Sequence, residues 1–197
     1  NIIWLLGLMI GILLPAAIIF AKERLNNKIL FRSDIENVLT IPIIGEVFET
    51  KIAESELVFV ENSRSVIAES IRAIRTKLPF YFTHETEKVL LISSSIPGEG
   101  KSFIAANLGL SMALMGKRTL LIGGDMRKPR IHKAFDVSNA IGLSTFLIGK
   151  CQVEDTLFGT EHENLYVLPS GPIPPNPSEL LMGERFQKLM VNLRVEF

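Results

Sequence analysis

The hydrophobic and polar positions of this chain predict alternating strands and helices in its second half. Short apolar runs at 89–92, 119–122 and 165–169 have the length and composition of buried strands. Residues 103–115 lie between the first two runs, show helical spacing and end at Gly116. A strand, a helix and a strand in this order predict a βαβ unit whose strands are parallel neighbours. The pattern therefore predicts an α/β fold with a mainly parallel sheet flanked by helices.

Two further helices are predicted outside this unit. Residues 60–82 carry an apolar stripe at helical spacing, formed by Ile67, Ile71, Ile74 and Leu78. A last helix should run from Pro177 to roughly Arg194. Its start fits the preferred helix N-terminus, with Asn176 as N-cap, proline at the first helical position and Glu179 at the third.

An uncharged apolar block opens the chain. Residues 2–21 include no charged side chain, and a helix of that length spans about 30 Å, the thickness of a bilayer's hydrocarbon core. Basic residues follow, as expected on the cytoplasmic side of a span: Lys22, Arg24, Lys28 and Arg32. We expect a transmembrane helix over residues 1–21, a cytoplasmic juxtamembrane linker over 22–59 and a globular domain over 60–197. A signal peptide and a buried core helix are the alternatives for the first block.

The bulk composition excludes several classes of function. The formal net charge of the 197 residues is zero, which argues against bulk electrostatic binding to nucleic acid. Cys151 is the only cysteine, so an intrachain disulfide is impossible and cysteine spacing typical of a metal site is absent.

The connection between the first apolar run and the helix carries the clearest chemical signal. Residues 95–102 follow the phosphate-loop pattern G-x-x-x-x-G-K-[ST], with serine in place of the first glycine. Gly98 and Gly100 permit the backbone angles of such a loop, and the N-terminus of the helix attracts phosphate. Lys101 can reach the β- and γ-phosphates, and Ser102 can place its hydroxyl on Mg²⁺. The alternative is an ordinary strand–helix turn with a surface lysine.

A second chemical signal follows the run at 119–122. Asp125 should lie at the carboxyl edge of the sheet, where open α/β sheets bind ligands. A carboxylate there suits a Mg²⁺ ligand or a base, and a turn aspartate is the alternative. Arg127, Lys128 and Arg130 either stabilise phosphate charge or are simply solvated.

These motifs, in this order, resemble the bacterial tyrosine kinases of capsule and exopolysaccharide biosynthesis, the BY-kinases, over nearly the whole chain. Residues 95–102 resemble the family's Walker A segment. Residues 120–129 resemble its second motif, h-h-h-h-D-x-D-x-R, in which h is a hydrophobic residue and x is any residue. Residues 174–181 match a characteristic loop and helix start, and 41–46 are similar to a linker motif. Residues 69–75 match the E-x-x-R-x-x-R motif, which mediates ring-shaped oligomers in the family.

The resemblance implies a P-loop fold and transfer of the γ-phosphoryl group from Mg·ATP to tyrosine. Catalytic residues would be Lys101, Asp125 and Arg127, and Mg²⁺ would be held by Ser102 and Asp125. The nucleotide would be bound by the loop and the helix start, namely Pro97, Gly98, Glu99, Gly100, Lys101, Ser102 and Phe103. Oligomerisation would use Glu69, Arg72 and Arg75, although local evidence alone favours a solvated, salt-bridged helix face.

The resemblance also implies partners and a location. The chain would form a ring-like homo-oligomer at the bacterial inner membrane, with the residues after about 21 in the cytoplasm. It would regulate capsule or exopolysaccharide synthesis, work with the polymerisation and export machinery, and be dephosphorylated by a cognate tyrosine phosphatase. No nucleic-acid partner is expected.

Three features depart from the family's pattern. Gly123 stands where the second motif has its first aspartate. No Walker B run follows the last helix, so we expect the chain to be a fragment without a complete active site. Tyr81 and Tyr166 are the only tyrosines, so a tyrosine cluster is absent.

Two other functions stay open on this evidence. A nucleotide-sensing scaffold in polysaccharide assembly, without kinase chemistry, would be consistent with these departures. A partitioning-type P-loop ATPase is the other alternative, although that group usually carries an additional lysine early in the loop, where Ile96 and Pro97 stand here.

Overall fold

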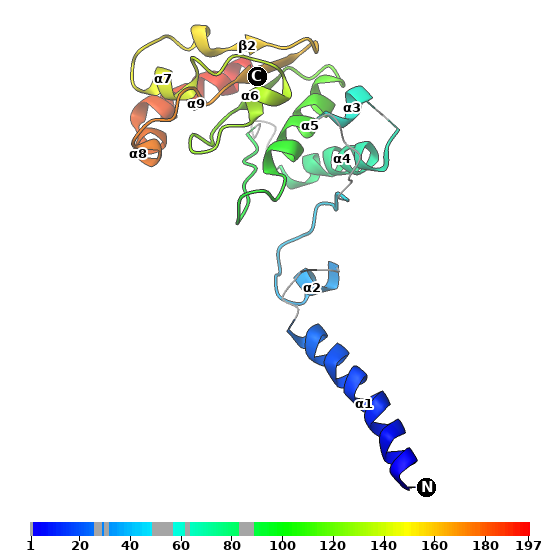
Figure 1. The fold of residues 1–197 in the computed structure, drawn as a ribbon. Coiled ribbons are helices and arrows are strands. Elements are labelled where there is room, and N and C mark those ends of the chain that lie inside the picture. The colour runs from blue at the N-terminus through cyan, green and yellow to red at the C-terminus, as the bar shows by residue number, and fades with distance from the viewer. Residues whose placement is uncertain (1, 26–28, 30–31, 49–56, 62–63, 83–88) are drawn as a thin grey trace. The chain divides into compact units, whose positions relative to one another are not determined.

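The computed structural model describes residues 2–25, 29, 32–48, 57–61, 64–82 and 89–197 (Figure 1). The chain divides into two compact units, Asn1–Ile43 and Ile44–Phe197.

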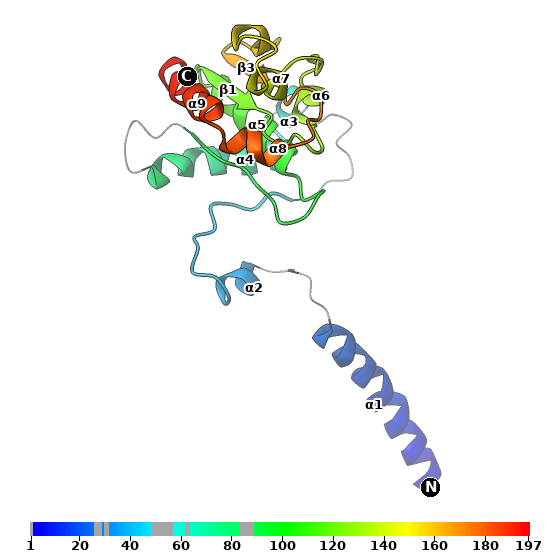
Figure 2. The ribbon, with the colours of Figure 1, turned by 90° about the vertical axis from the view of Figure 1, so that its left-hand side faces the viewer.

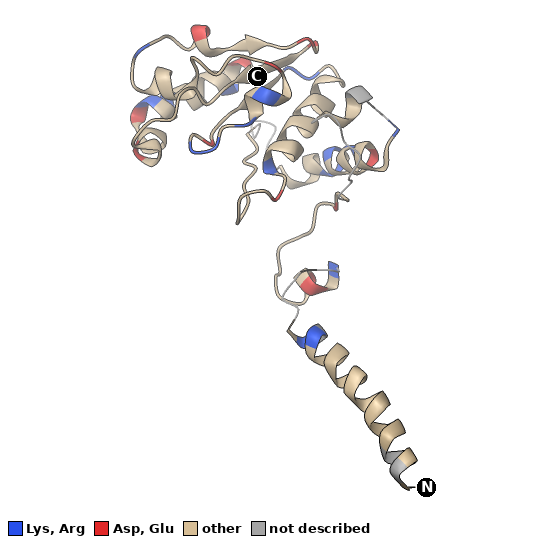
Figure 3. Cartoon of the chain, in the orientation of Figure 1, with Lys and Arg blue, Asp and Glu red and all other residues tan. Residues whose placement is uncertain are grey.

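The first unit contains helices α1 (Ile2–Arg24) and α2 (Arg32–Glu36). Among the described residues of α1, charged side chains are confined to its C-terminal end (Figure 3). Among the described residues, none of the helices combines the length and the apolar character that a membrane span requires. The structure therefore does not support the transmembrane helix predicted over residues 1–21.

The second unit contains the remaining elements. In chain order they are α3 (Val58–Glu61), α4 (Val66–Lys77), η1 (Leu78–Tyr81), α5 (Lys101–Ala113), β1 (Thr119–Ile122), α6 (Ile131–Ala134), α7 (Leu143–Leu147), η2 (Glu154–Thr156), β2 (Phe158–Gly159), β3 (Leu165–Leu168), α8 (Pro177–Met182) and α9 (Glu184–Glu196). The helices predicted over 103–115 and over the greater part of 60–82, and the strands predicted over 119–122 and 165–169, are thus confirmed within a few residues.

The sheet differs from the prediction in its pairing. Within the described residues its strand order is β1-β3-β2, with β1 parallel to β3 and β2 antiparallel to β3. Thr119 is paired with Leu165, so the parallel neighbour of β1 comes from residues 165–168. Residues 89–92 form no strand, and Leu91 is 86% exposed, so the βαβ unit predicted from the run at 89–92 is wrong. A strand needs a neighbour for its N–H and C=O groups, and an apolar run alone does not supply one.

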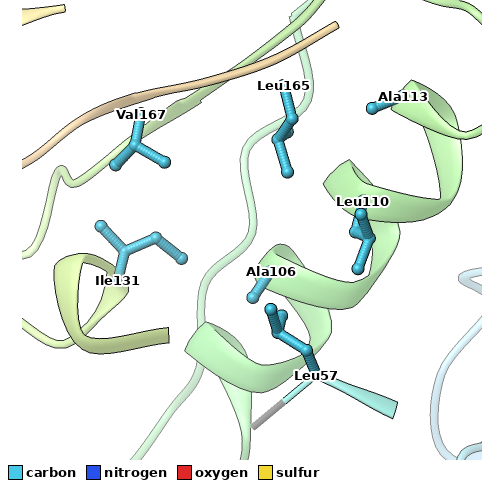
Figure 4. Close-up of a cluster of buried hydrophobic side chains, with 7 residues drawn as sticks. All are labelled: Leu57, Ala106, Leu110, Ala113, Ile131, Leu165 and Val167. Carbon is cyan, nitrogen blue, oxygen red and sulfur yellow. The ribbon is translucent and has the colours of Figure 1, made fainter. Parts of the chain in front are cut away.

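The side chains of β3 alternate between two cores, as the pleat of a strand requires. Leu165 and Val167 pack with Ala106 and Leu110 of α5 (Figure 4). Leu168 packs on the other face with buried leucines of α7 and α9. In Figure 2, α5 and α9 lie on opposite sides of β1. Helices thus cover both faces of the sheet, which confirms the predicted α/β class.

Residues ahead of the predicted boundary at 60 contribute to the second unit. Leu57 and Val58 are buried in its two neighbouring cores, and the unit begins at Ile44. The amide of Asn107, a fully buried residue of α5, accepts a 2.8 Å hydrogen bond from the Val58 N–H. A polar side chain in the core is stabilised only when it is bonded in this way, so Asn107 fixes the approach of α3 to α5.

The last predicted helix is divided into two. Gly183 separates α8 from α9. Asn176 is the N-cap residue of α8, as predicted, and its side-chain amide donates a 2.8 Å hydrogen bond to the carboxylate of Glu179. This hydrogen bond connects two side chains, and the Asn176 side chain makes no capping hydrogen bond to the backbone of α8.

Candidate active site

The backbone of the phosphate loop has the conformation that its glycines permit. Gly98 has φ of +96°, and Gly100, the N-cap of α5, has φ of +91°. Both values lie in the left-handed region, which L side chains rarely adopt. Among described residues other than glycine, positive φ is found only at Asp136 and Asn164, so Ser95 has a negative φ. A side chain is therefore compatible with the first position of the loop.

We expect Gly100→Ala to weaken nucleotide binding about tenfold, since left-handed backbone costs an L residue roughly 1–2 kcal/mol. A Cβ at Gly100 would meet no atom within 4 Å, so the effect isolates backbone strain from steric contact. Gly159→Ala is the matched control, because that position has equally open space and ordinary φ. Titration calorimetry with Mg·ATP measures both, and equal affinities would contradict the role of the left-handed loop.

An ion pair joins the start of α5 to the segment after β1. Lys101 Nζ lies 2.9 Å from Asp125 Oδ2, and the two side chains are 30% and 32% exposed. The other carboxylate oxygen, Oδ1, accepts hydrogen bonds from the N–H groups of Arg127 at 3.1 Å and Lys128 at 2.9 Å. The turn that follows β1 thus holds the Asp125 carboxylate toward the phosphate loop.

The same contacts set the ionisation of this carboxyl. Burial by itself would raise the pKa of Asp125, but the N–H of Lys128, the ammonium of Lys101 and the N–H of Arg127 outweigh it and hold the pKa below its ordinary value. Asp125 is therefore an anion at neutral pH, available to a cation or to a hydroxyl donor.

A cavity lies where the start of α5, the end of β1 and the loop after β3 come together. Its lining includes Lys101, Ser102, Gly123, Asp125, Arg130 and Ser170. A second cavity is also lined by Lys101 and Asp125, together with residues 93–97 and the apolar side chains of Leu91, Leu181 and Phe186. The ion pair therefore borders both cavities.

The remaining loop residues have different places. Pro97 lines the second cavity. Glu99 Oε2 accepts hydrogen bonds from the N–H groups of Ser95 at 2.9 Å and Ile96 at 3.2 Å, which closes the loop on itself. The side chain of Phe103 packs in the core beneath α4, so only its backbone is placed for a phosphate.

The arginine in the cavity is not the one that the motif indicates. Arg127 is exposed and lines neither cavity, and its backbone N–H donates the hydrogen bond to Asp125. Arg130 lines the first cavity. Ser170 and Gly123 also line the first cavity. Ser170 could not be predicted from the sequence, because it follows a strand and belongs to no recognised motif.

The donor set suits magnesium bound together with a nucleotide. Among the described residues, no group of three or more His, Cys, Asp or Glu is placed to hold a metal ion. Mg²⁺ is usually held by one or two carboxylates plus substrate phosphates, and Ser102 and Asp125 line one cavity. The residues present fit Mg·ATP on these grounds.

The three residues predicted to mediate oligomerisation make two different kinds of contact within the chain. Glu69 Oε1 and Arg72 Nη1 form a 2.6 Å ion pair along α4, and the Arg72 guanidinium lies 5.1 Å from the ring centre of Phe59. Arg75 instead donates from Nη1 to the backbone carbonyl of Ser111 at 3.0 Å and to its hydroxyl at 2.8 Å. Since Ser111 is fully buried, Arg75 attaches α4 to α5 inside the fold.

We expect Arg75→Ala to lower the free energy of unfolding by about 1–3 kcal/mol, because the buried oxygens of Ser111 lose a charged donor. Glu69→Ala, in the same motif, should cost about 0–1 kcal/mol, since the Glu69 side chain is 66% exposed and its ion pair with Arg72 is open to solvent. Urea unfolding of both variants measures the difference. Equal losses would show that Arg75 has no special part in holding the helices together.

Taken together, a phosphate loop opening a helix of an α/β unit, with a lysine and a carboxylate beside it, defines a P-loop nucleotide-binding protein. A scan against models of known protein families gives no match. The chain is 40% identical over 136 residues to the tyrosine-protein kinase YwqD of Bacillus subtilis, a match covering 69% of this chain and 57% of YwqD.

Solved structures give the same assignment. The crystal structure of the chimerical protein CapA2B2 is matched with a TM-score of 0.77 and 39% identity, over 84% of this chain and 71% of that one. The kinase domain of Escherichia coli tyrosine kinase ETK is matched with a TM-score of 0.77 and 26% identity, over 86% and 71%. The chain belongs to the family of bacterial tyrosine-protein kinases, and it spans less than two thirds of YwqD.

Proposed function

We propose that the full-length protein is a protein-tyrosine autokinase that transfers the γ-phosphoryl group of ATP to tyrosine. The observation that carries the proposal is the Lys101–Asp125 ion pair beside a loop whose glycines, Gly98 and Gly100, have left-handed backbone conformations. The relatives named tyrosine-protein kinases support the choice of tyrosine as acceptor.

The loop performs the positioning. Backbone N–H groups from Gly98 to Phe103 and the N-terminus of α5 surround the phosphates, where the helix dipole favours negative charge. Lys101 exchanges its contact with Asp125 for oxygens of the β- and γ-phosphates. Such preorganised charge is worth most in a site that excludes water, so the lysine stabilises the transferred group more than it stabilises free ATP.

Asp125 is placed for two tasks. With the hydroxyl of Ser102 it would hold Mg²⁺, which neutralises phosphate charge when bound. Its carboxylate also accepts the proton of the incoming tyrosine hydroxyl as the bond from that oxygen to the γ-phosphorus forms. The bond between the γ-phosphorus and the bridging oxygen breaks, and ADP leaves. Arg130, which lines the cavity, is better placed than Arg127 to face the transferred charge.

The full-length protein, incubated with labelled ATP and Mg²⁺, should become labelled on tyrosine. Calorimetry should detect heat from ATP in the presence of magnesium. Absence of both signals would refute the proposal, and steady ATP hydrolysis without tyrosine labelling would favour the partitioning-type ATPase.

A nucleotide-binding scaffold is the second candidate function. Tyr166 favours it, because this tyrosine lies in β3 with its ring 5.4 Å from that of Phe197 and 5.1 Å from the Arg118 guanidinium. Such a tyrosine is not displayed as an acceptor, and Tyr81 is the other one in the chain. The scaffold would oligomerise on binding nucleotide without forming phosphotyrosine.

The assembly and the biological setting belong to the same proposal. Glu69, which is exposed, and Arg72, which is half-buried against Phe59, would contact a neighbouring copy in a ring-like homo-oligomer. Regulation of capsule or exopolysaccharide export, and dephosphorylation by a cognate tyrosine phosphatase, rest on the resemblance of the motifs. Sedimentation of Glu69→Ala beside the unchanged protein tests the assembly, since loss of the ring with an intact fold is the expected result.

Location at the bacterial inner membrane rests on the sequence alone. Its support is the uncharged block at 2–21 and the basic residues Lys22 and Arg24. Fractionation of cells that make the full-length protein should place it with the inner membrane after carbonate washing. Recovery in the soluble fraction would remove this part of the proposal and leave the kinase chemistry unaffected.

A further inference from the structure

We propose that Ser170 is a positioning residue for Asp125 and that the glycine at position 123 is what admits it to the site. The inference rests on the proposed function for its kinetic consequence, but its structural part can be tested without catalysis.

The first observation concerns the space at Gly123. Its N–H donates a 2.8 Å hydrogen bond to the carbonyl of Leu168, which holds the end of β1 against the end of β3. A Cβ at this position would lie 2.8 Å from both the backbone nitrogen and the hydroxyl oxygen of Ser170. Real Cβ atoms do not approach that closely, and the backbone cannot give way as a flexible side chain can. Ser170 can therefore occupy its observed position only because residue 123 is a glycine.

The second observation concerns what Ser170 does there. The residue is fully buried, lines the same cavity as Lys101 and Asp125, and donates from its hydroxyl to the backbone carbonyl of Asp125 at 3.2 Å. A buried hydroxyl is retained where it has a partner, and here the partner is the backbone of the residue that contacts Lys101. The hydroxyl thus restrains the carbonyl of Asp125 while the next N–H groups restrain its carboxylate.

Ser170 is in turn held by α7. The N–H groups of Leu143 and Ser144, at the start of this helix, donate to the carbonyls of Pro169 at 2.8 Å and Ser170 at 2.9 Å. The hydroxyl of Ser144 donates to the carbonyl of Pro172 at 2.7 Å. The loop after β3 is therefore anchored on both sides of Ser170, which makes it a rigid support for Asp125.

This arrangement gives the departure at Gly123 a physical meaning. Where the related motif has a carboxylate, this chain has no side chain, and the hydroxyl of Ser170, from the loop after β3, occupies the neighbouring space. Chemistry that depends on positioning is sensitive to small displacements, and an error of about 1 Å can cost up to 10²-fold in rate. Loss of one of several restraints on Asp125 should cost less than that.

The test compares two buried hydroxyls in the full-length protein. Ser170→Ala should lower kcat for tyrosine phosphorylation about tenfold and change KM for ATP less than about twofold. Thr156→Val removes a similar hydrogen bond, from a buried hydroxyl to the backbone carbonyl of Val153 at 2.7 Å, at a residue that lines neither cavity, and should leave kcat unchanged. Equal kcat values for Ser170→Ala and the unchanged protein, measured with active enzyme, would overturn the inference.

A double substitution tests the coupling to position 123. Gly123→Ala should displace Ser170 and also lower kcat about tenfold, and Gly123→Ala with Ser170→Ala should be no slower than either alone, since both remove one contact. If kcat of the double variant fell about a hundredfold, the product of the two single decreases, the two positions would be acting independently.

Hydrogen exchange gives a readout that does not need kinase activity. In Ser170→Ala, the N–H groups of Arg127 and Lys128, which bond to Asp125, should exchange about tenfold faster. They should exchange at the normal rate in Thr156→Val. Unchanged exchange in both variants would refute the positioning role, whereas absence of phosphotyrosine in the unchanged protein would refute the proposed function alone.

Discussion

Replacing Lys101 by alanine is expected to lower tyrosine phosphorylation by the full-length protein about 10²–10³-fold. The lysine is the cation that the structure places at the start of α5 within 2.9 Å of Asp125, bordering both cavities. Without the lysine, the negative charge that develops on the transferred phosphoryl group loses its main side-chain partner. ATP affinity should also fall, because the lysine contacts the phosphates in the ground state.

Lys188→Ala is the matched control for this substitution. Lys188 also forms an ion pair with a carboxylate, 3.3 Å from Glu184, but on the exposed surface of α9. Labelling with ATP and Mg²⁺, read as phosphotyrosine, should be unchanged in this variant. Equal labelling of Lys101→Ala and the unchanged protein would show that the loop does not carry the chemistry.

The Asp125→Asn variant should lose about 10²–10³-fold in kcat while still binding ATP. Asparagine keeps the shape of the side chain but removes the negative charge that would hold magnesium and accept the tyrosine proton. Removal of a carboxylate beside the phosphates also removes a repulsion, so affinity for ATP should not decrease. Asp155→Asn is the control, because Asp155 likewise accepts a backbone N–H bond, from Gln152 at 3.0 Å, on the exposed surface.

The same variant tests the ionisation of Asp125. Since the pKa of the folded state is lowered from the ordinary 3.8, ionised Asp125 stabilises the fold at pH values above 3.8. That contribution is lost as the pH falls through the lower pKa of the folded state, and Asp125→Asn should not show the loss. Urea unfolding of both proteins across this acidic range measures the difference. A constant difference at every pH would mean that the pKa of Asp125 is not lowered by folding.

The parts of the site that follow one another along the chain could be predicted. The loop from Ser95 to Ser102 was found because two glycines, a lysine and a hydroxyl recur at a set spacing before a helix, and spacing is visible in one dimension. Asp125 was found because it follows a strand, and strands end at the ligand-binding edge of a sheet. Both predictions needed only local conformation and chain direction.

The parts that depend on contacts between distant residues could not be predicted. Ser170 lies 45 residues from Asp125 in the sequence, and no sequence pattern predicts the hydrogen bond between them. The motif indicates Arg127, yet Arg130 lines the first cavity and Arg127 lines neither, and spacing along the chain does not distinguish them. Arg75 belongs to a surface motif by its spacing, and only the packing of α4 on α5 shows that it reaches Ser111.

By itself the sequence determined the phosphate loop, the helix that begins at Lys101, the strands β1 and β3, and the α/β class. Each of these follows from the period of apolar side chains or from the backbone freedom of glycine, which are properties of neighbouring residues. Only the tertiary structure decided that β1 pairs with β3, that residues 89–92 remain without a strand partner among the described residues, and that Ser170 enters the site. Pairing and side-chain contact are settled by which surfaces bury one another, and that choice is made among residues far apart in the chain.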